Sequence, residues 1–296
     1  SILSKLSWVT TSGKGIGIIL TNGDDITKLA GIETLDNPLP PLMAVNTTAG
    51  TGSELTRHAV ITNEEDHLKF VVVSWRNIPL VSFNDPMLML GVPKSVTAAT
   101  GCDAFVQAIE PYVSVDHNPI TDSQCKEAIQ LIQEALPEAV ANGQNVEART
   151  KMVEAEMLAG MAFNNANLGY VHAMAHQLGG QYDAPHGVCC ALLLTTVEEY
   201  NLIACPDRFA ELARIMGYDT TGLTTMQAAE KSIDGMREMC KAVGIPSSIK
   251  AIGAKPEDFS LMAENALKDG NAFSNPCKGT KQDIIDLYQK AYDGIY

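Results

Sequence analysis

Three of the six histidines in the chain lie close together in the sequence, at His172, His176 and His186. The first two are four residues apart, so on a helix they share one face. Gly179 and Gly180 predict the end of that helix, and Pro185 predicts the start of another helix that carries the third histidine. Two histidines on one helix face, a chain reversal and a third histidine at the start of the next helix can bring three imidazoles to a common point. The pattern therefore predicts a site that binds a metal ion or moves a proton beside one.

A carboxylate that could join this set lies earlier in the chain, on a helix predicted over residues 96–113. Asp103 and Gln107 are one helical turn apart there, beside the apolar stripe of the helix. Asp103 with His172 and His186 would make a set of two histidines and one carboxylate, which suits Fe²⁺ or Zn²⁺ and leaves a position for substrate. On spacing alone an alternative stays open, in which Asp103 caps or pairs locally and the histidines are hydrogen-bonded core groups.

A second candidate site is the loop at residues 47–53, which follows a predicted strand and is rich in glycine and hydroxyl side chains. Its backbone N–H groups and hydroxyls could hold a phosphate or a nicotinamide ribose. No Gly-Lys-Ser/Thr sequence closes the loop, so it is not a Walker phosphate loop. An ordinary tight turn is the alternative that this composition leaves open.

The elements that must position these residues fall into two parts. The first part predicts α/β structure, with strands at 42–45 and 80–83 and a hairpin of strands 59–62 and 70–73 joined by a turn at 63–66. After Pro93 the pattern predicts only helices, at 96–113, 120–140, 148–164, 167–178, 186–201, 207–216, 226–243 and 281–291. We therefore predict an α/β domain over residues 1–92 and an all-α domain over residues 93–296.

Composition narrows the class of protein. The net charge is −14 and no basic stripe occurs, which argues against nucleic acid as a partner. No apolar run is long enough to span a bilayer, so a membrane partner is not expected. The seven cysteines form no CxxC pair and lie in apolar or helical surroundings. This cysteine usage predicts reduced, buried thiols and a cytoplasmic location.

Longer stretches of the chain resemble the iron-containing, group III, alcohol dehydrogenases, and most of all their 1,3-propanediol and methanol dehydrogenase branch. In chain order they are NPLPPLMAVNTTAGTGSE, TAATGCDAFVQAIE, GMAFNNANLGYVHAMAHQLGGQYDAPHGV and ALKDGNAFSNP. The resemblance implies a dehydroquinate-synthase-like architecture: an N-terminal dinucleotide-binding α/β domain, an all-α C-terminal metal-binding domain, and the site in the cleft between them. It also implies hydride transfer between NAD and a small alcohol or aldehyde substrate.

The resemblance further implies roles for individual residues. Positions of the family's metal ligands, which would hold Fe²⁺ or Zn²⁺, match Asp103, Gln107, His172 and His186. The position of its proton-handling histidine matches His176, which would pass the alcohol proton to solvent. Positions that contact NAD match Thr47, Thr48, Thr51 and Lys69. Acidic helical domains of this kind resemble those that form dimers and larger rings, so a homo-oligomer is expected.

Two departures from the family pattern lower the expected activity. Gln107 stands where the second ligand is histidine, and an amide oxygen is a weaker ligand than imidazole, so we expect reduced metal affinity or a water in its place. The stretch from Ser1 to Ser12 does not match the family's pyrophosphate loop, and only residues 9–15 overlap the end of that region. We therefore expect an incomplete dinucleotide-binding domain, from truncation or with weak NAD binding, and an exposed apolar sheet edge. These departures favour an alternative hypothesis, a degenerate or truncated non-catalytic relative that keeps the scaffold and the oligomer contacts.

Overall fold

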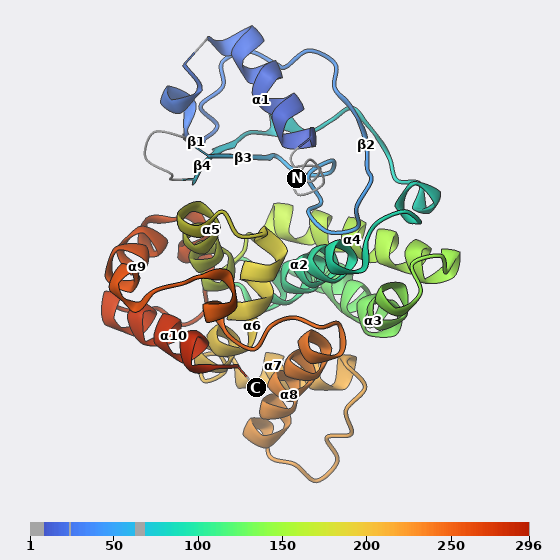
Figure 1. Ribbon diagram of the computed structural model, residues 1–296, viewed down its shortest axis with the longest axis vertical. Coiled ribbons are helices and arrows are strands. Elements are labelled where there is room, and N and C mark those ends of the chain that lie inside the picture. Colours follow the sequence, from blue (N-terminus) through green and yellow to red (C-terminus); the bar gives the residue numbers. More distant parts are fainter. Residues whose placement is uncertain (1–8, 24, 63–68, 296) are drawn as a thin grey trace.

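A computed structural model describes residues 9–23, 25–62 and 69–295 of the chain. A small α/β part packs on a larger helical part, and helices α5, α2 and α4 form the surface that faces it (Figure 1). In the described residues no strand follows Phe83, as the sequence predicts. No helix among them is long and apolar enough to cross a membrane.

The α/β part holds two small sheets and one helix. Its elements are α1 (Val9–Asn22), η2 (Ile26–Leu29), β1 (Gly31–Ile32), β2 (Met43–Val45), β3 (His58–Thr62), β4 (Lys69–Val73), η3 (Trp75–Asn77), β5 (Val81–Phe83) and η4 (Pro86–Met89). Strand β4 pairs antiparallel with β3 and parallel with β1, and β2 pairs parallel with β5. The predicted hairpin is thus confirmed, while its predicted turn at 63–66 lies outside the described residues.

Helix α1 covers one face of the hairpin. Ile18 of α1 is fully buried in a small core with Leu35, Ala59 and Val72. The sequence pattern does not indicate this helix, because its glycines and threonines have low helix propensity. Strands β2 and β5 instead expose their apolar side chains, with Met43 at 65% and Phe83 at 52%. This second sheet therefore presents apolar side chains to solvent.

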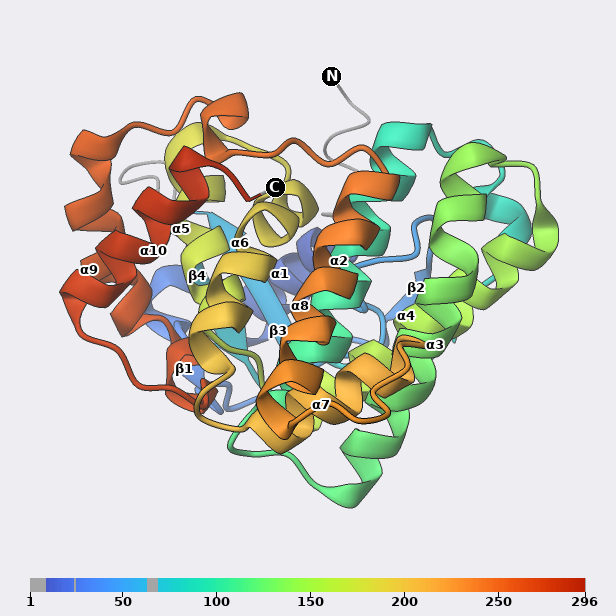
Figure 2. The same ribbon diagram turned by 90° about the horizontal axis from the view of Figure 1, so that it is seen from below.

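The helical part is built around α2. Its elements are α2 (Lys94–Val113), α3 (Pro119–Ala141), α4 (Val146–Ala166), α5 (Tyr170–Tyr182), α6 (His186–Asn201), α7 (Pro206–Ile215), α8 (Thr225–Ala242), η5 (Ile249–Ile252), η6 (Pro256–Asp258), α9 (Phe259–Lys268), η7 (Gly270–Ser274) and α10 (Lys281–Asp293). Helix α2 contacts α3, α4 and α6 and lies in the middle of this part when seen from below (Figure 2). Because α2 is buried on nearly every side, its polar residues must find partners in the interior.

One sequence prediction about the histidine helix is wrong. Gly179 and Gly180 do not end α5, which continues to Tyr182 and stops at Asp183, a residue with a left-handed φ of 49°. Gly179 instead allows a close approach, because a Cβ there would lie 3.2 Å from the Nζ atom of Lys69 on β4. The absence of a side chain at Gly179 thus allows the contact between the two parts of the chain and does not mark the helix end.

Candidate metal centre and cleft

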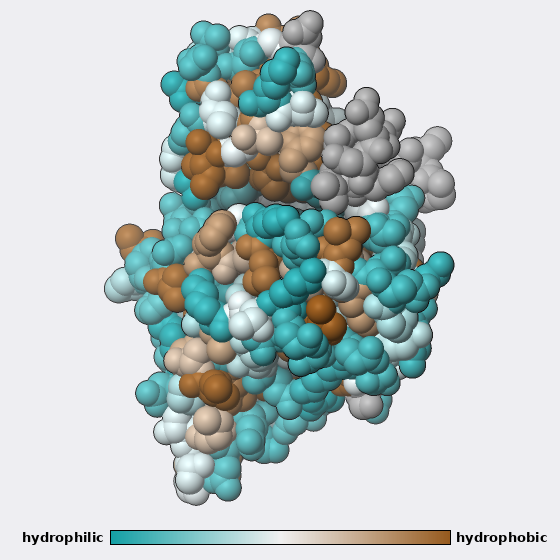
Figure 3. Space-filling view, turned by 90° about the vertical axis from the view of Figure 1, so that its left-hand side faces the viewer, coloured by the Kyte–Doolittle hydropathy of each residue, from teal (hydrophilic) through white to brown (hydrophobic). Residues whose placement is uncertain are grey.

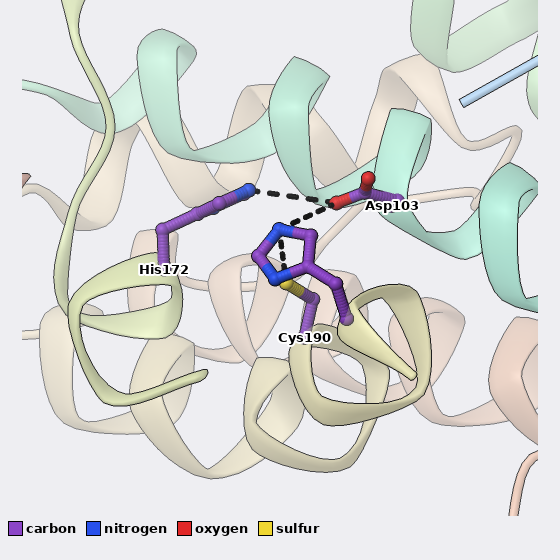
Figure 4. A group of neighbouring side chains, drawn as sticks. Asp103, His172 and Cys190 are labelled. Carbon is purple, nitrogen blue, oxygen red and sulfur yellow. Dashed lines mark hydrogen bonds and ion pairs between the residues drawn. The ribbon is translucent and has the colours of Figure 1, made fainter. Parts of the chain in front are cut away.

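The candidate metal centre lies where three helices meet (Figure 4). Asp103 comes from α2, His172 from α5, and His186 is the first residue of α6. The Oδ1 atom of Asp103 lies 3.5 Å from His172 Nε2 and 3.6 Å from His186 Nε2. Asp103 and His172 are both almost completely buried. The structure thus brings together the predicted carboxylate and two of the predicted histidines.

Several polar atoms of this centre are buried without a hydrogen-bond partner among the described residues. They are Asp103 Oδ1, Gln107 Oε1, His172 Nε2 and His186 Nδ1. An unpaired polar atom in the interior costs about 1–3 kcal/mol, so a cluster of them is unfavourable unless a further group satisfies it. Carboxylate oxygen and imidazole nitrogen are metal donors, and an amide oxygen is a weaker one. The donor set therefore fits a divalent cation such as Fe²⁺ or Zn²⁺.

Glu110, one turn beyond Gln107 on α2, orients His172. Its Oε2 atom lies 2.5 Å from His172 Nδ1, and its Oε1 atom accepts the backbone N–H of Val171 at 2.7 Å. A proton held between Nδ1 and Glu110 leaves the Nε2 lone pair directed toward Asp103. Burial lowers the pKa of His172, but the neighbouring Cys190, Glu110 and Asp103 outweigh burial and raise this pKa well above its usual value. The surroundings of the ring therefore favour a positive charge at this point, which a bound cation would supply while Nε2 keeps its lone pair.

Helix α6 reaches α2 through a close contact at Gly187. A Cβ at Gly187 would lie 2.0 Å from the carbonyl oxygen of Ala99 and 3.3 Å from Asp103 Cβ. Glycine therefore lets the backbones approach, and this approach places the preceding residue, His186, beside Asp103. Gly187 carries no sequence signal of its own beyond its position next to the histidine.

His176 lies beside the metal-binding group and faces a different partner. Its Nδ1 atom is 2.7 Å from Asp269 Oδ2, and its ring stacks on His186 with centroids 5.5 Å apart. Asp269 also accepts the N–H of Asn271 at the start of η7. Burial raises the pKa of Asp269, but His176 outweighs burial, so this pKa lies below its usual value. The pair places an oriented proton-carrying ring at the edge of the centre, and Asp269 is a member of it that the sequence pattern did not predict.

A cavity of about 530 Å³ lies between the α/β part and the helical part, within the size range of small-molecule sites. Asp103, Gln107, His172, His176 and His186 all line it, as do Thr51 and Lys69 among the predicted cofactor residues. Thr47 and Thr48 do not line the cavity. Figure 3 shows the constriction between the two parts, with apolar side chains on its α/β side. The cavity thus joins the candidate metal centre to one end of the threonine loop.

The loop that carries Thr51 is fixed against helix α4. The N–H of Gly52 donates to Glu156 Oε1 at 2.7 Å. Gly52 has a positive φ of 57°, and a Cβ there would lie 3.0 Å from the Cα atom of Gly160. The loop therefore rests directly on the helix backbone, which holds Thr51 at the cavity wall.

Cys190 is a neighbour of the metal centre that the sequence pattern did not indicate. It follows His186 by one turn of α6 and is fully buried. Its Sγ atom lies 3.6 Å from His186 Nε2. Ligand atoms of Asp103, His172, His186 and Cys190 all lie within 4.8 Å of one another. Burial raises the pKa of the Cys190 thiol to about 12, so the thiol is neutral unless a cation lies beside it. The spacing of four residues after His186 is the signal that could have found it.

Comparison with known proteins agrees with this architecture. The chain is 58% identical over 280 residues to the 1,3-propanediol dehydrogenase of Klebsiella pneumoniae, covering 95% of this chain and 72% of the relative. It is 42% identical to the NAD-dependent methanol dehydrogenase of Bacillus methanolicus, covering 95% and 74% of the two chains. A solved alcohol dehydrogenase from Oenococcus oeni superposes with a TM-score of 0.93 at 80% identity, covering 96% of this chain and 74% of that one.

Taken with the cleft and its candidate cation site, these likenesses define an alcohol dehydrogenase. Residues 97–292 match the Fe-containing alcohol dehydrogenase family, C-terminal, and residues 9–86 match Iron-containing alcohol dehydrogenase. The chain belongs to the iron-containing alcohol dehydrogenase family, in its 1,3-propanediol dehydrogenase branch. The predicted family and the fold class, an α/β part followed by an all-helical part, are confirmed. The alternative of a non-catalytic relative finds no support in these comparisons.

Proposed function

We propose that this chain interconverts short primary alcohols or diols, such as 1,3-propanediol, with their aldehydes by metal-dependent hydride transfer to and from NAD. The unpaired buried atoms Asp103 Oδ1 and His172 Nε2, which lie close to His186 Nε2 on the wall of the cavity, carry this proposal. The name of the Klebsiella relative supports the choice of diol, and that of the Bacillus relative supports NAD. Homo-oligomer formation and a cytoplasmic location stay predictions, and light scattering of the purified protein tests the first.

The residues of the centre would hold Fe²⁺ or Zn²⁺ through Asp103, His172 and His186, with Gln107 as a weaker donor on the cleft side. A bound metal would supply a Lewis acid that polarises the alcohol oxygen. Glu110 keeps the Nε2 lone pair of His172 available for this role. Asp103, Gln107, His172 and His176 on the cavity wall are themselves buried, which limits the access of water to the reacting atoms.

His176 is the group that we propose to move the alcohol proton. Its Nδ1 atom is held by Asp269, so the opposite ring nitrogen is left to exchange a proton with the substrate or with water. The Asp269 carboxylate stabilises the ring when it takes up that proton. We propose that Thr51 and Lys69, on the same cavity wall, contact the nicotinamide side of NAD. Thr47 and Thr48 would act away from the cavity, on the remainder of the nucleotide.

The direct test is NADH oxidation with 3-hydroxypropanal, measured by absorbance after removal of metal with a chelator and after addition of Fe²⁺ or Zn²⁺. We expect turnover only in the metal-loaded protein, and a loss of turnover in His172→Ala. Tyr218→Phe is a matched control, because Tyr218 donates to Glu238 on an exposed face and does not line the cavity. Absence of turnover at every metal loading would refute the catalytic proposal for this chain.

A further inference from the structure

We propose that the Cys190 sulfur is a ligand of the metal, so that Asp103, His172, His186 and Cys190 bind the ion and Gln107 is left on the substrate side. The inference rests on the proposed function, because it assigns a further donor to the same metal centre. It differs from the prediction made from sequence, in which Gln107 supplies the fourth ligand.

The distances between the donor atoms fit one ion. Ligands about 2.1 Å from a tetrahedral ion lie about 3.4 Å apart, and a sulfur at about 2.3 Å lies about 3.6 Å from a nitrogen ligand. The structure has 3.5 Å from Asp103 Oδ1 to His172 Nε2, 3.6 Å from Asp103 Oδ1 to His186 Nε2, and 3.6 Å from Cys190 Sγ to His186 Nε2. All four ligand atoms lie within 4.8 Å of one another, so small shifts of the side chains would let a single cation contact them all (Figure 4).

Cys190 and Gln107 differ in their exposure to the cavity. Gln107 lines the cavity, whereas Cys190 is fully buried and does not line it. A sulfur ligand from the buried side therefore leaves the cleft side open for the alcohol oxygen. A thiolate is also a stronger ligand than an amide oxygen for Zn²⁺ and similar ions. Cys190 can in this way compensate for the weak donor at Gln107.

Binding of the metal ion to Cys190 requires no oxidant or reductant. The S–H bond of Cys190 breaks, its proton leaves to solvent, and a sulfur–metal bond forms with no change in oxidation state. The alternative role of Cys190 is that of a small apolar core residue. That role does not explain why unpaired donor atoms of Asp103 and His172 lie beside the sulfur. A soft sulfur ligand also predicts that the site prefers Zn²⁺ or Co²⁺ to Fe²⁺.

Co²⁺ titration of the metal-free protein tests this inference by absorption spectroscopy, which is independent of turnover. We expect one Co²⁺ to bind with a thiolate-to-cobalt charge-transfer band in the near ultraviolet. In Cys190→Ser this band should disappear and Co²⁺ should bind at least about tenfold more weakly, since even groups that only support ligands change metal affinity by 10–100-fold. Cys189→Ser is the matched control, because Cys189 is equally buried next in sequence but outside the ligand group. It should keep both the band and the affinity.

The possible results separate this inference from the proposed function. Co²⁺ that binds to the unsubstituted protein without the charge-transfer band, or a band that Cys190→Ser retains, would overturn the role of Cys190 and leave the metal site intact. Failure of the unsubstituted protein to bind Co²⁺ would refute the metal site itself, and the role of Cys190 with it. X-ray absorption of the Zn²⁺-loaded protein needs no variant, so it decides the question even if Cys190→Ser does not fold. We expect one sulfur at about 2.3 Å, and only nitrogen and oxygen neighbours would contradict the inference.

Discussion

Replacement of Glu110 by glutamine probes how the interior prepares His172 for a metal. Both carboxylate oxygens of Glu110 accept a hydrogen bond, one from the Val171 N–H and one shared with His172 Nδ1. A glutamine has only one oxygen, so its NH₂ group must face one of these partners. If the NH₂ group faces Val171, it meets the backbone N–H there and two donors oppose each other. If the NH₂ group faces His172, it donates to Nδ1, and the ring proton moves to Nε2. Either arrangement disturbs the lone pair that points toward Asp103.

The expected magnitude for Glu110→Gln follows from this geometry. Loss of a group that orients a ligand typically lowers metal affinity by about 10–100-fold, which corresponds to about 1.4–2.7 kcal/mol. We expect a loss in this range for Zn²⁺, measured by competition with a chromophoric chelator at neutral pH. The helix itself should remain folded, because glutamine has nearly the same volume as glutamate.

Glu198→Gln provides the matched control for this measurement. Glu198 is fully buried near Glu110, but it bonds to Asn201 and does not contact His172. Burial, and then the charge of Glu110, raise the pKa of Glu198 to about 8, so its carboxyl is mostly neutral at pH 7 and glutamine resembles it closely. Zn²⁺ affinity should therefore change little in Glu198→Gln. Equal affinities in Glu110→Gln and the unsubstituted protein would refute the assignment of Glu110 as the group that orients His172.

Three further predictions concern packing, pH and the weak donor. Gly187→Ala should lower the melting temperature and weaken Zn²⁺ binding, because its Cβ would overlap the carbonyl of Ala99 at 2.0 Å; unchanged calorimetry and affinity would contradict this contact. Burial lowers the pKa of Lys14 from 10.5 to about 7 in the folded protein. Between these two pH values the unfolded chain binds more protons at this lysine than the folded chain does, so Lys14 makes the free energy of unfolding rise with pH from about 7 to 10.5. Urea unfolding at about pH 7 and pH 9 should show this rise relative to Lys14→Met, and parallel curves for the two proteins would exclude it. Gln107→His should raise metal content by elemental analysis, since imidazole is the stronger ligand, and equal content would place Gln107 outside the metal's reach.

The sequence predicted the helices that carry the site better than it predicted what surrounds them. Periodicity places Asp103 on one helix and His172 with His176 on another, because burial of one helical face imposes spacings of three and four residues. The predicted end of α5 was wrong, because a glycine that ends a helix and a glycine that allows a close contact look the same in sequence. Only the position of Lys69 in the structure distinguishes the two. Asp269 reaches His176 from 93 residues away, a contact set by tertiary packing alone.

Helix α2 and helix α6 nevertheless carry a local signal for the residues that support the site. Asp103, Gln107 and Glu110 follow one another at spacings of four and three residues, so they form a polar stripe on a helix that is otherwise apolar and buried. Interior polar groups persist only where partners satisfy them, so such a stripe predicts that each member faces a charged or donor group on another element. Glu110 meets His172 and Val171 in this way, and the unpaired atoms of Asp103 and Gln107 remain for a ligand. Cys190 follows His186 at the same spacing on α6, so a stripe of donors on each of two buried helices is a stronger indication of a metal centre than the three histidines alone.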